Sequence, residues 1–165
     1  MSVRVQVVNR TLIPICLKEK SWGLIWPDTA PGSEALLECP QHFVGKTVSR
    51  LCSMKDATTP EWQIPDFSFC LFEPLVIHYN KFKSLTLGYQ NTSGSETIFL
   101  FWEILRTRDL PLYPGEGDRI LSILTEIERY QYHIDPSDLH ASTETLIRII
   151  SRILNDENSI LNQQV

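Results

Sequence analysis

The chain has 165 residues, of which 21% are charged, and its formal net charge at pH 7 is −5. This length accommodates one or two domains. Nucleic-acid binding needs a basic face, so the mild and dispersed negative charge excludes a nucleic-acid partner. No segment approaches the roughly 20 apolar residues of a membrane span, and the first residues, MSVRVQVVNR, lack the apolar core of a signal peptide. If the chain is secreted, we therefore expect it to be a fragment of a longer protein.

Residues 1–11 are predicted to form an N-terminal strand or linker. β-Branched residues alternate with other types over residues 3–8 (VRVQVV), and a period of two is typical of a half-buried strand. This segment precedes the cysteine-rich part of the chain.

Residues 12–70 hold all four cysteines and three of the four tryptophans. Pro and Gly are frequent here and the apolar runs are short, which predicts short strands joined by turns. The cysteines include no C-x-x-C pair, whereas structural zinc usually takes its ligands from such close pairs. Disulfides are therefore favoured over zinc, and four cysteines leave three pairings open. A module this small needs cross-links, and disulfides persist in oxidising, extracellular compartments.

No cysteine follows Cys70, and this change in composition marks the predicted domain boundary. We expect residues 71–94 to form a linker and residues 95–165 to form a helical module. The predicted fold class is therefore α+β, with a small disulfide-stapled β-rich module followed by a helical module.

Three helices are predicted within the helical module. The first covers residues 96–108 with Ser95 as its cap, the second covers 117–132, and the third covers 142–155 with Ser142 or Thr143 as its cap. Apolar residues recur at helical spacing in the last two. Their predicted apolar faces are Ile120, Leu121, Ile123, Leu124 and Ile127, and then Leu146, Ile149, Ile150, Ile153 and Leu154.

The sequence offers no catalytic, metal or cofactor site. The four histidines, His42, His78, His133 and His140, are scattered among polar residues, and no G-x-S-x-G elbow is present. The PGEGD segment lacks the lysine of a phosphate loop. We therefore expect a protein that is not an enzyme and that binds no cofactor.

Two further features concern the packing of the cysteine-rich module and the glycosylation of the chain. Trp26, Arg50 and Trp62 could form a stack, because each indole face attracts a guanidinium. Spacing alone nevertheless favours an Arg50 side chain that faces solvent. Asn9 and Asn91 each begin an N-x-S/T sequon, and Asn91 lies in the polar run QNTSGSE, so both are candidate glycosylation sites.

The order of these landmarks resembles the hormone-receptor motif domain of secretin-like and adhesion G-protein-coupled receptors. From Cys16 to Cys70 the sequence has Cys, Trp-Pro, Pro-Gly, Cys-Pro, Arg-x-Cys, Trp and Cys in that family's order. Ile25 stands where secretin-like receptors have an extra cysteine, and the four-cysteine pattern is typical of adhesion receptors. The resemblance implies that Cys16 pairs with Cys52 and Cys39 with Cys70.

The same resemblance implies a structural role for Arg50. It places this arginine between rings that correspond to Trp26 and Trp62. The family's acidic partner for the arginine falls near Ser21, which is not acidic, and the nearby carboxylate of Asp28 could replace it.

The C-terminal part is similar, less specifically, to the start of the autoproteolysis-inducing domain of adhesion receptors, whose first half is helical. The similarity lies in residues 111–127 (PLYPGEGDRILSILTEI) and 145–154 (TLIRIISRIL). The family's cleavage motif, His-Leu-Thr or His-Leu-Ser, is absent from the sequence. The resemblance therefore implies a fragment that ends inside this domain.

The function that we predict is that of a non-catalytic fragment of an adhesion-type receptor on the extracellular side of the plasma membrane. It would contact an extracellular protein ligand or position a neighbouring receptor domain, and the full-length receptor would be anchored in the membrane outside this fragment. The alternative is a secreted or cell-surface interaction module without a signalling function. Free thiols would instead favour an intracellular protein.

Overall fold

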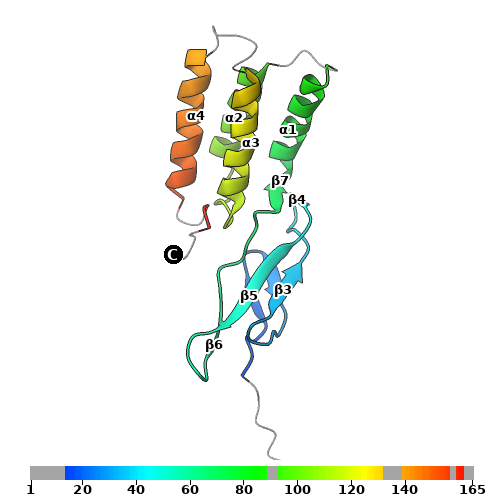
Figure 1. Cartoon of the computed structure of the whole chain (residues 1–165), viewed down its shortest axis with the longest axis vertical. Coiled ribbons are helices and arrows are strands. Elements are labelled where there is room, and N and C mark those ends of the chain that lie inside the picture. The colour runs from blue at the N-terminus through cyan, green and yellow to red at the C-terminus, as the bar shows by residue number, and fades with distance from the viewer. Residues whose placement is uncertain (1–13, 89–92, 132–138, 157–158, 162–165) are drawn as a thin grey trace, which may run out of the picture.

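The computed structural model describes residues 14–88, 93–131, 139–156 and 159–161. Two modules lie end to end, with the strands in one and the helices in the other (Figure 1). We call residues 14–72 the β module and the described residues from 73 onward the helical module. The predicted α+β class is thus confirmed, whereas the strand predicted for residues 3–8 lies outside the described residues.

Short antiparallel strands build the β module. Among the described residues, β1 pairs with β2, β5 lies between β3 and β6, and β4 pairs with β7. The strands are β1 (Glu19–Ser21), β2 (Leu24–Trp26), β3 (Glu34–Leu37), β4 (Phe43–Gly45), β5 (Val48–Met54), β6 (Pro60–Trp62) and β7 (Cys70–Phe72).

The β1–β2 hairpin turns through Trp22 and Gly23, whose φ angles are 55° and 73°. Positive φ at both loop residues is the geometry of a type I′ turn, which suits the twist of paired strands. A tryptophan is rare in this conformation, because its Cβ crowds the backbone there. The turn aims the Trp22 ring at the helical module.

The core of the β module is small and largely aromatic. Along β5 the side chains alternate, so that Val48, Arg50 and Cys52 point inward. The buried residues of this core are Trp26, Ala35, Phe43, Val48, Phe67 and Cys70.

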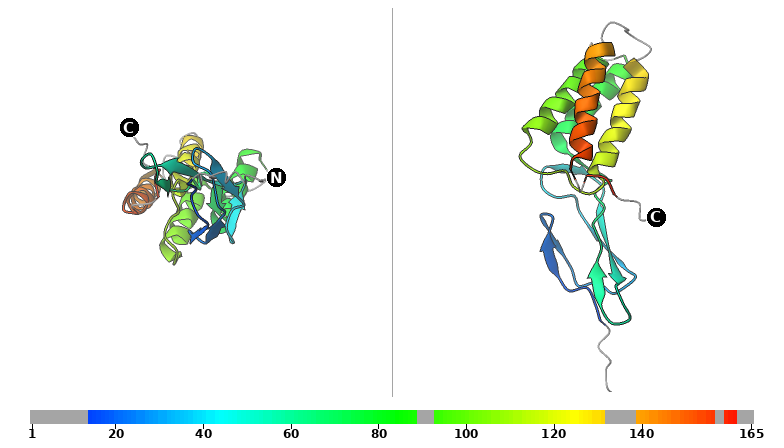
Figure 2. Two further views of the ribbon diagram at one scale, coloured as in Figure 1. Left: turned by 90° about the horizontal axis from the view of Figure 1, so that it is seen from below. Right: turned by 90° about the vertical axis from the view of Figure 1, so that its left-hand side faces the viewer.

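Among the described residues, the helical module holds α1 (Glu73–Thr86), α2 (Gly94–Thr107), α3 (Glu116–Gln131) and α4 (Leu139–Leu154). The helices lie side by side along the long axis of the molecule (Figure 2). None of the described helices is long and apolar enough to cross a bilayer. Their shared core consists of Leu71, Leu75, Phe82, Ile98, Phe101, Leu105, Leu112, Ile120, Ile123, Leu124, Ile127, Ile149 and Ile153.

The linker expected over residues 71–94 is wrong for most of its length, because residues 73–86 form α1. Leu75 and Phe82 are fully buried against the other helices, and Val76 and Tyr79 pack beside them. The spacing of these four residues is that of one helix face. The segment therefore belongs to the bundle rather than connecting two modules across solvent.

Two of the predicted caps are also wrong. α2 is capped by Ser93, whose Oγ accepts a hydrogen bond from the backbone N–H of Glu96 at 3.0 Å, rather than by Ser95. Ser-x-x-Glu is the pattern of a capping box. α4 begins at Leu139, so Ser142 lies inside the helix and is buried.

The predicted apolar face of α4 is correct only in part. Ile149 and Ile153 are fully buried, whereas Ile150 is 39% exposed and Leu154 is 62% exposed. The buried face repeats at positions 142, 146, 149 and 153, since Leu146 also packs against the core. Ser142 is polar but lies on the buried face of α4. The pattern of apolar residues alone therefore placed Ile150 on that face instead.

Candidate functional site

Both disulfides have the pairing that the resemblance implies. Cys16 is bonded to Cys52 and Cys39 is bonded to Cys70, with Cα–Cα distances of 5.9 and 5.8 Å. Cys52 lies in β5, and Cys70 is the first residue of β7, immediately before the helical module. One disulfide thus ties the segment before the β1–β2 hairpin to the central strand β5, and the other lies next to the helices.

Arg50 packs against two indole rings and forms the first arginine–aromatic cluster; the two rings also contact each other, with centroids 6.1 Å apart, so the guanidinium does not separate them. Its guanidinium carbon is 5.4 Å from the ring centroid of Trp26 and 5.1 Å from that of Trp62. Arg50 is only 7% exposed. The solvent-facing position that spacing alone favoured is therefore wrong, because β5 directs this side chain into the core.

The acidic partner of Arg50 is Glu19 and not Asp28. The Arg50 Nη1 donates to Glu19 Oε1 at 2.9 Å and to Ser21 Oγ at 3.0 Å. Residues 19 and 21 point to the same side of β1, because side chains alternate along a strand. Asp28 instead accepts a hydrogen bond from the backbone N–H of Lys18 at 2.6 Å. Hydrogen bonds from Ser21 and then Arg50 lower the pKa of Glu19 below its usual value.

A second arginine–aromatic cluster lies where the two modules meet, and its two phenylalanine rings also contact each other. The Arg108 guanidinium carbon is 5.2 Å from the ring centroid of Phe43 and 4.8 Å from that of Phe72. Its Nη1 donates to Glu116 Oε1 at 2.6 Å, and its Nη2 donates to the carbonyl of Pro111 at 2.9 Å. The side chains of Arg108 and Glu116 are 2% and 0% exposed. This ion pair is therefore a buried one.

Tyr113 completes this contact from the loop between α2 and α3. Its ring stacks on Phe43, with centroids 5.0 Å apart, and lies 4.6 Å from the ring of Phe67. The Trp22 ring is perpendicular to the Tyr113 ring, with centroids 6.0 Å apart. We call the residues of this contact the joint. The joint comprises Trp22, Phe43, Phe67, Phe72, Arg108, Tyr113 and Glu116.

Sequence reasoning missed the joint. The segment that holds Arg108 and Tyr113 has the composition of a turn, and Glu116 alone is explained by its place at the start of a helix. A charged residue is rarely buried unless it is paired. No local pattern indicates that Arg108 and Glu116 form such a pair across the loop.

The described histidines lie on separate elements: His42 on a loop, His78 on α1 and His140 on α4. His133 and the two candidate glycosylation sites, Asn9 and Asn91, lie outside the described residues. The pKa of His78 lies below its usual value. Burial is the main cause and the charge of Lys81 adds to it, and together they outweigh the opposite effect of Glu96. Within the described ranges, no group of His, Cys, Asp and Glu is arranged to hold a metal ion.

No protein-family model matches the chain. The chain is similar to adhesion G protein-coupled receptor B3 of Mus musculus, with 25% identity over 149 residues. The match covers 87% of this chain and 10% of the receptor, so the chain spans about a tenth of the length of the curated relative. This weak similarity and the two disulfides are consistent with an extracellular receptor module.

Proposed function

We propose that this chain is a non-catalytic, extracellular part of an adhesion-type receptor, which holds the β module in a set position on the helical module. The similarity to an adhesion receptor over most of the chain supports the receptor class. The disulfides support an oxidising compartment.

The joint is the observation that supports the positioning role most directly. Interfaces between flexibly linked domains are usually polar and permit relative motion. Here a buried ion pair and several aromatic rings fill the contact, and β7 continues directly into α1 without a linker. The backbone N–H of Phe67 also donates to the carbonyl of Pro114 at 2.8 Å. These contacts favour one relative orientation of the modules.

Residual dipolar couplings of the backbone amides test the positioning role. In the wild-type chain we expect one alignment tensor to fit both modules. Tyr113→Ala removes the central ring of the joint without leaving a buried charge, so two different tensors are expected. Tyr130→Ala is the matched control, because Tyr130 packs on Phe82 within the helical module. Two different tensors in the wild-type chain would overturn the positioning role.

The absence of catalysis is part of the same proposal. The purified chain, produced with its glycans in mammalian cells, is incubated for days and examined by intact mass. We expect one species, whose mass falls after enzymatic removal of N-glycans if Asn9 or Asn91 is modified. A new pair of fragments that sum to the parent mass, formed without added protease, would refute a non-catalytic chain.

A further inference from the structure

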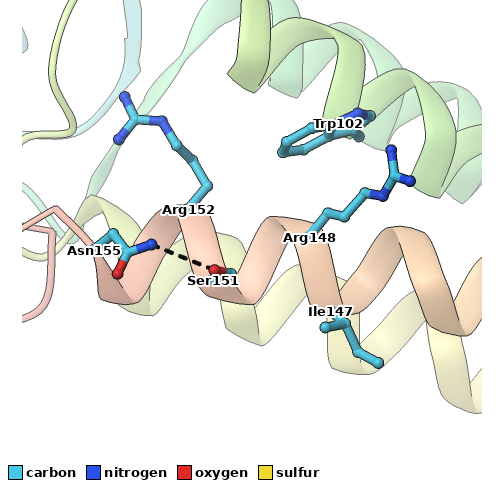
Figure 3. Close-up of a pocket in the computed structure, with 6 residues that line it drawn as sticks. All are labelled: Trp102, Ile147, Arg148, Ser151, Arg152 and Asn155. Atoms are coloured by element: carbon cyan, nitrogen blue, oxygen red, sulfur yellow. Dashed lines mark hydrogen bonds between the residues drawn. The ribbon is translucent and has the colours of Figure 1, made fainter.

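A groove of about 390 Å³ lies between α2 and α4, on the side of the helical module (Figure 3). Trp102 comes from α2, and the other lining residues come from α4 or, for Asn155, from the turn that follows it. In Figure 3 the Arg148 and Arg152 side chains extend from α4 on the side of the Trp102 indole. The lining consists of Trp102, Ile147, Arg148, Ser151, Arg152 and Asn155.

Two arginines and no acidic residue line the groove, and the carboxylates that pair with these arginines lie outside the lining. Each arginine pairs with a carboxylate four residues away: Arg148 with Glu144 on α4 at 2.7 Å, and Arg152 with Asp156, just past the end of α4, at 3.4 Å. The first pair is more than half exposed, and exposed ion pairs contribute only about 0–1 kcal/mol. A guanidinium has five N–H donors, so it can bind a second carboxylate beside the first.

Both helices also expose an apolar side chain. Phe99 lies one turn before Trp102 on α2 and is 53% exposed, and Ile147 on α4 is 61% exposed. A sulfated polysaccharide carries dense negative charge but little apolar surface. An acidic segment of a protein offers both carboxylates and apolar side chains, and it therefore complements this surface better.

The spacing of the two arginines restricts the ligand further. Arg148 and Arg152 are four residues apart on α4, which corresponds to a rise of about 6 Å. Carboxylates one helical turn apart have the same spacing, and so do carboxylates on alternate residues of an extended peptide. Either backbone can present two acidic side chains that flank an apolar one.

We propose that the α2–α4 groove binds an acidic, amphipathic segment of a partner protein, whose carboxylates pair with Arg148 and Arg152 while an apolar side chain packs against Trp102. This goes beyond the positioning role, because it assigns a protein-binding surface to the helical module. The joint takes no part in it, and the two proposals can therefore fail separately.

Trp102 provides a specific readout, because the other three tryptophans lie in the β module. Two synthetic probes are titrated into the isotope-labelled chain and followed at the Trp102 indole N–H. One is a helical peptide with two glutamates one turn apart and a leucine between them, and the other is an extended peptide with glutamates on alternate residues. At least one probe should shift this resonance, and its glutamine counterpart should not.

Charge-reversed variants test the pairing. Arg148→Glu combined with Arg152→Glu should weaken binding at least about tenfold, because two attractive pairs become repulsive. Binding to that variant should be restored when the glutamates of the probe are replaced by lysines. Arg119→Glu combined with Arg129→Glu is the matched control, because it changes the net charge equally on the exposed surface of α3. The control variant should bind as the wild type does.

Three outcomes would overturn the proposal. In the first, neither glutamate probe moves the Trp102 resonance. In the second, a heparin oligosaccharide shifts it through Arg148 and Arg152 while both peptides fail, which would make the ligand a glycan. In the third, the chain self-associates in sedimentation experiments and only the Arg148→Glu/Arg152→Glu variant is monomeric, which would place a second copy in the groove.

Discussion

At the scale of single residues, the two arginine–aromatic clusters are built in the same way. The guanidinium carbons of Arg50 and Arg108 each lie over two aromatic rings, while their N–H groups donate hydrogen bonds to a glutamate and to a backbone carbonyl. A lysine ammonium carries the same charge but has no planar face and fewer donors. Both positions therefore require arginine for its shape as well as its charge.

Arg50→Ala should lower the free energy of unfolding by about 2–3 kcal/mol, through lost stacking and lost charge-assisted hydrogen bonds. Arg50→Lys should recover less than half of that loss, because it restores the charge alone. Urea denaturation followed by tryptophan fluorescence measures both variants. A lysine variant as stable as the wild type would show that the planar geometry is irrelevant.

The ion pair of Arg50 predicts a dependence of stability on pH. Hydrogen bonds from Ser21 and Arg50 hold the pKa of Glu19 below its value of 4.5 in the unfolded chain, so the ionised carboxylate stabilises the fold. This contribution is present above about pH 4.5 and is lost as the pH falls through the lowered folded-state pKa. Because Glu19 is 42% exposed, solvent screening keeps the effect small.

We therefore expect the melting temperatures of the wild type and Glu19→Gln to differ near neutral pH and to converge as the solution is made acidic. Differential scanning calorimetry across this range provides the comparison. Subtracting the two curves removes the contributions of other carboxyl groups. Parallel curves down to the acid transition would mean that Glu19 does not contribute to the pH dependence.

At the scale of elements, the helices depend on their buried faces. α4 packs most closely on α2, with Ile149 and Ile153 fully buried and Ile147 directed outward. Most of the stability of a helix in a protein comes from such packing rather than from intrinsic propensity. The two faces of α4 should therefore differ strongly in their tolerance of substitution.

Ile149→Ala should destabilise the chain by about 2–5 kcal/mol, because it leaves a cavity in the helical core. Ile147→Ala deletes the same atoms from a side chain that is 61% exposed, so its effect should stay within about 0.5 kcal/mol. Thermal unfolding followed by circular dichroism compares the two variants. Equal shifts would mean that the orientation of α4 is wrong.

At the scale of the whole molecule, the two disulfides differ in their distance from the joint. Cys70 begins β7, which ends at Phe72 in the joint and leads directly into α1. Cys16 and Cys52 instead link the start of the described chain to β5 within the β module. The two disulfides close loops of similar length, but only Cys39–Cys70 lies next to the chain segment that connects the two modules.

Replacing both cysteines of either pair by serine should cost up to about 4 kcal/mol in the chain-entropy model, because the sequence separations are 36 and 31 residues. Loss of Cys39–Cys70 should also increase amide hydrogen exchange in α1. Loss of Cys16–Cys52 should leave exchange in α1 unchanged. Hydrogen-exchange mass spectrometry measures the exchange in α1 for both variants. Identical exchange patterns in the two variants would contradict this account.

The sequence by itself determined the order of the modules and most of the helices. Apolar periodicity and turn residues are local signals, which explains why α2 and α3 were predicted almost to their ends. The cysteine spacing alone left three pairings open. The disulfides and the contact of Arg50 with both tryptophans were predictable because the order of landmarks from Cys16 to Cys70 resembles a known domain.

Only the tertiary structure decided which distant residues meet. Glu19 rather than Asp28 binds Arg50, because β1 directs residues 19 and 21 toward β5. The joint brings Arg108 and Glu116 to rings from β4 and β7, far apart in the sequence. Burial of a charged pair depends on what surrounds it in space, and a linear pattern carries no record of those neighbours.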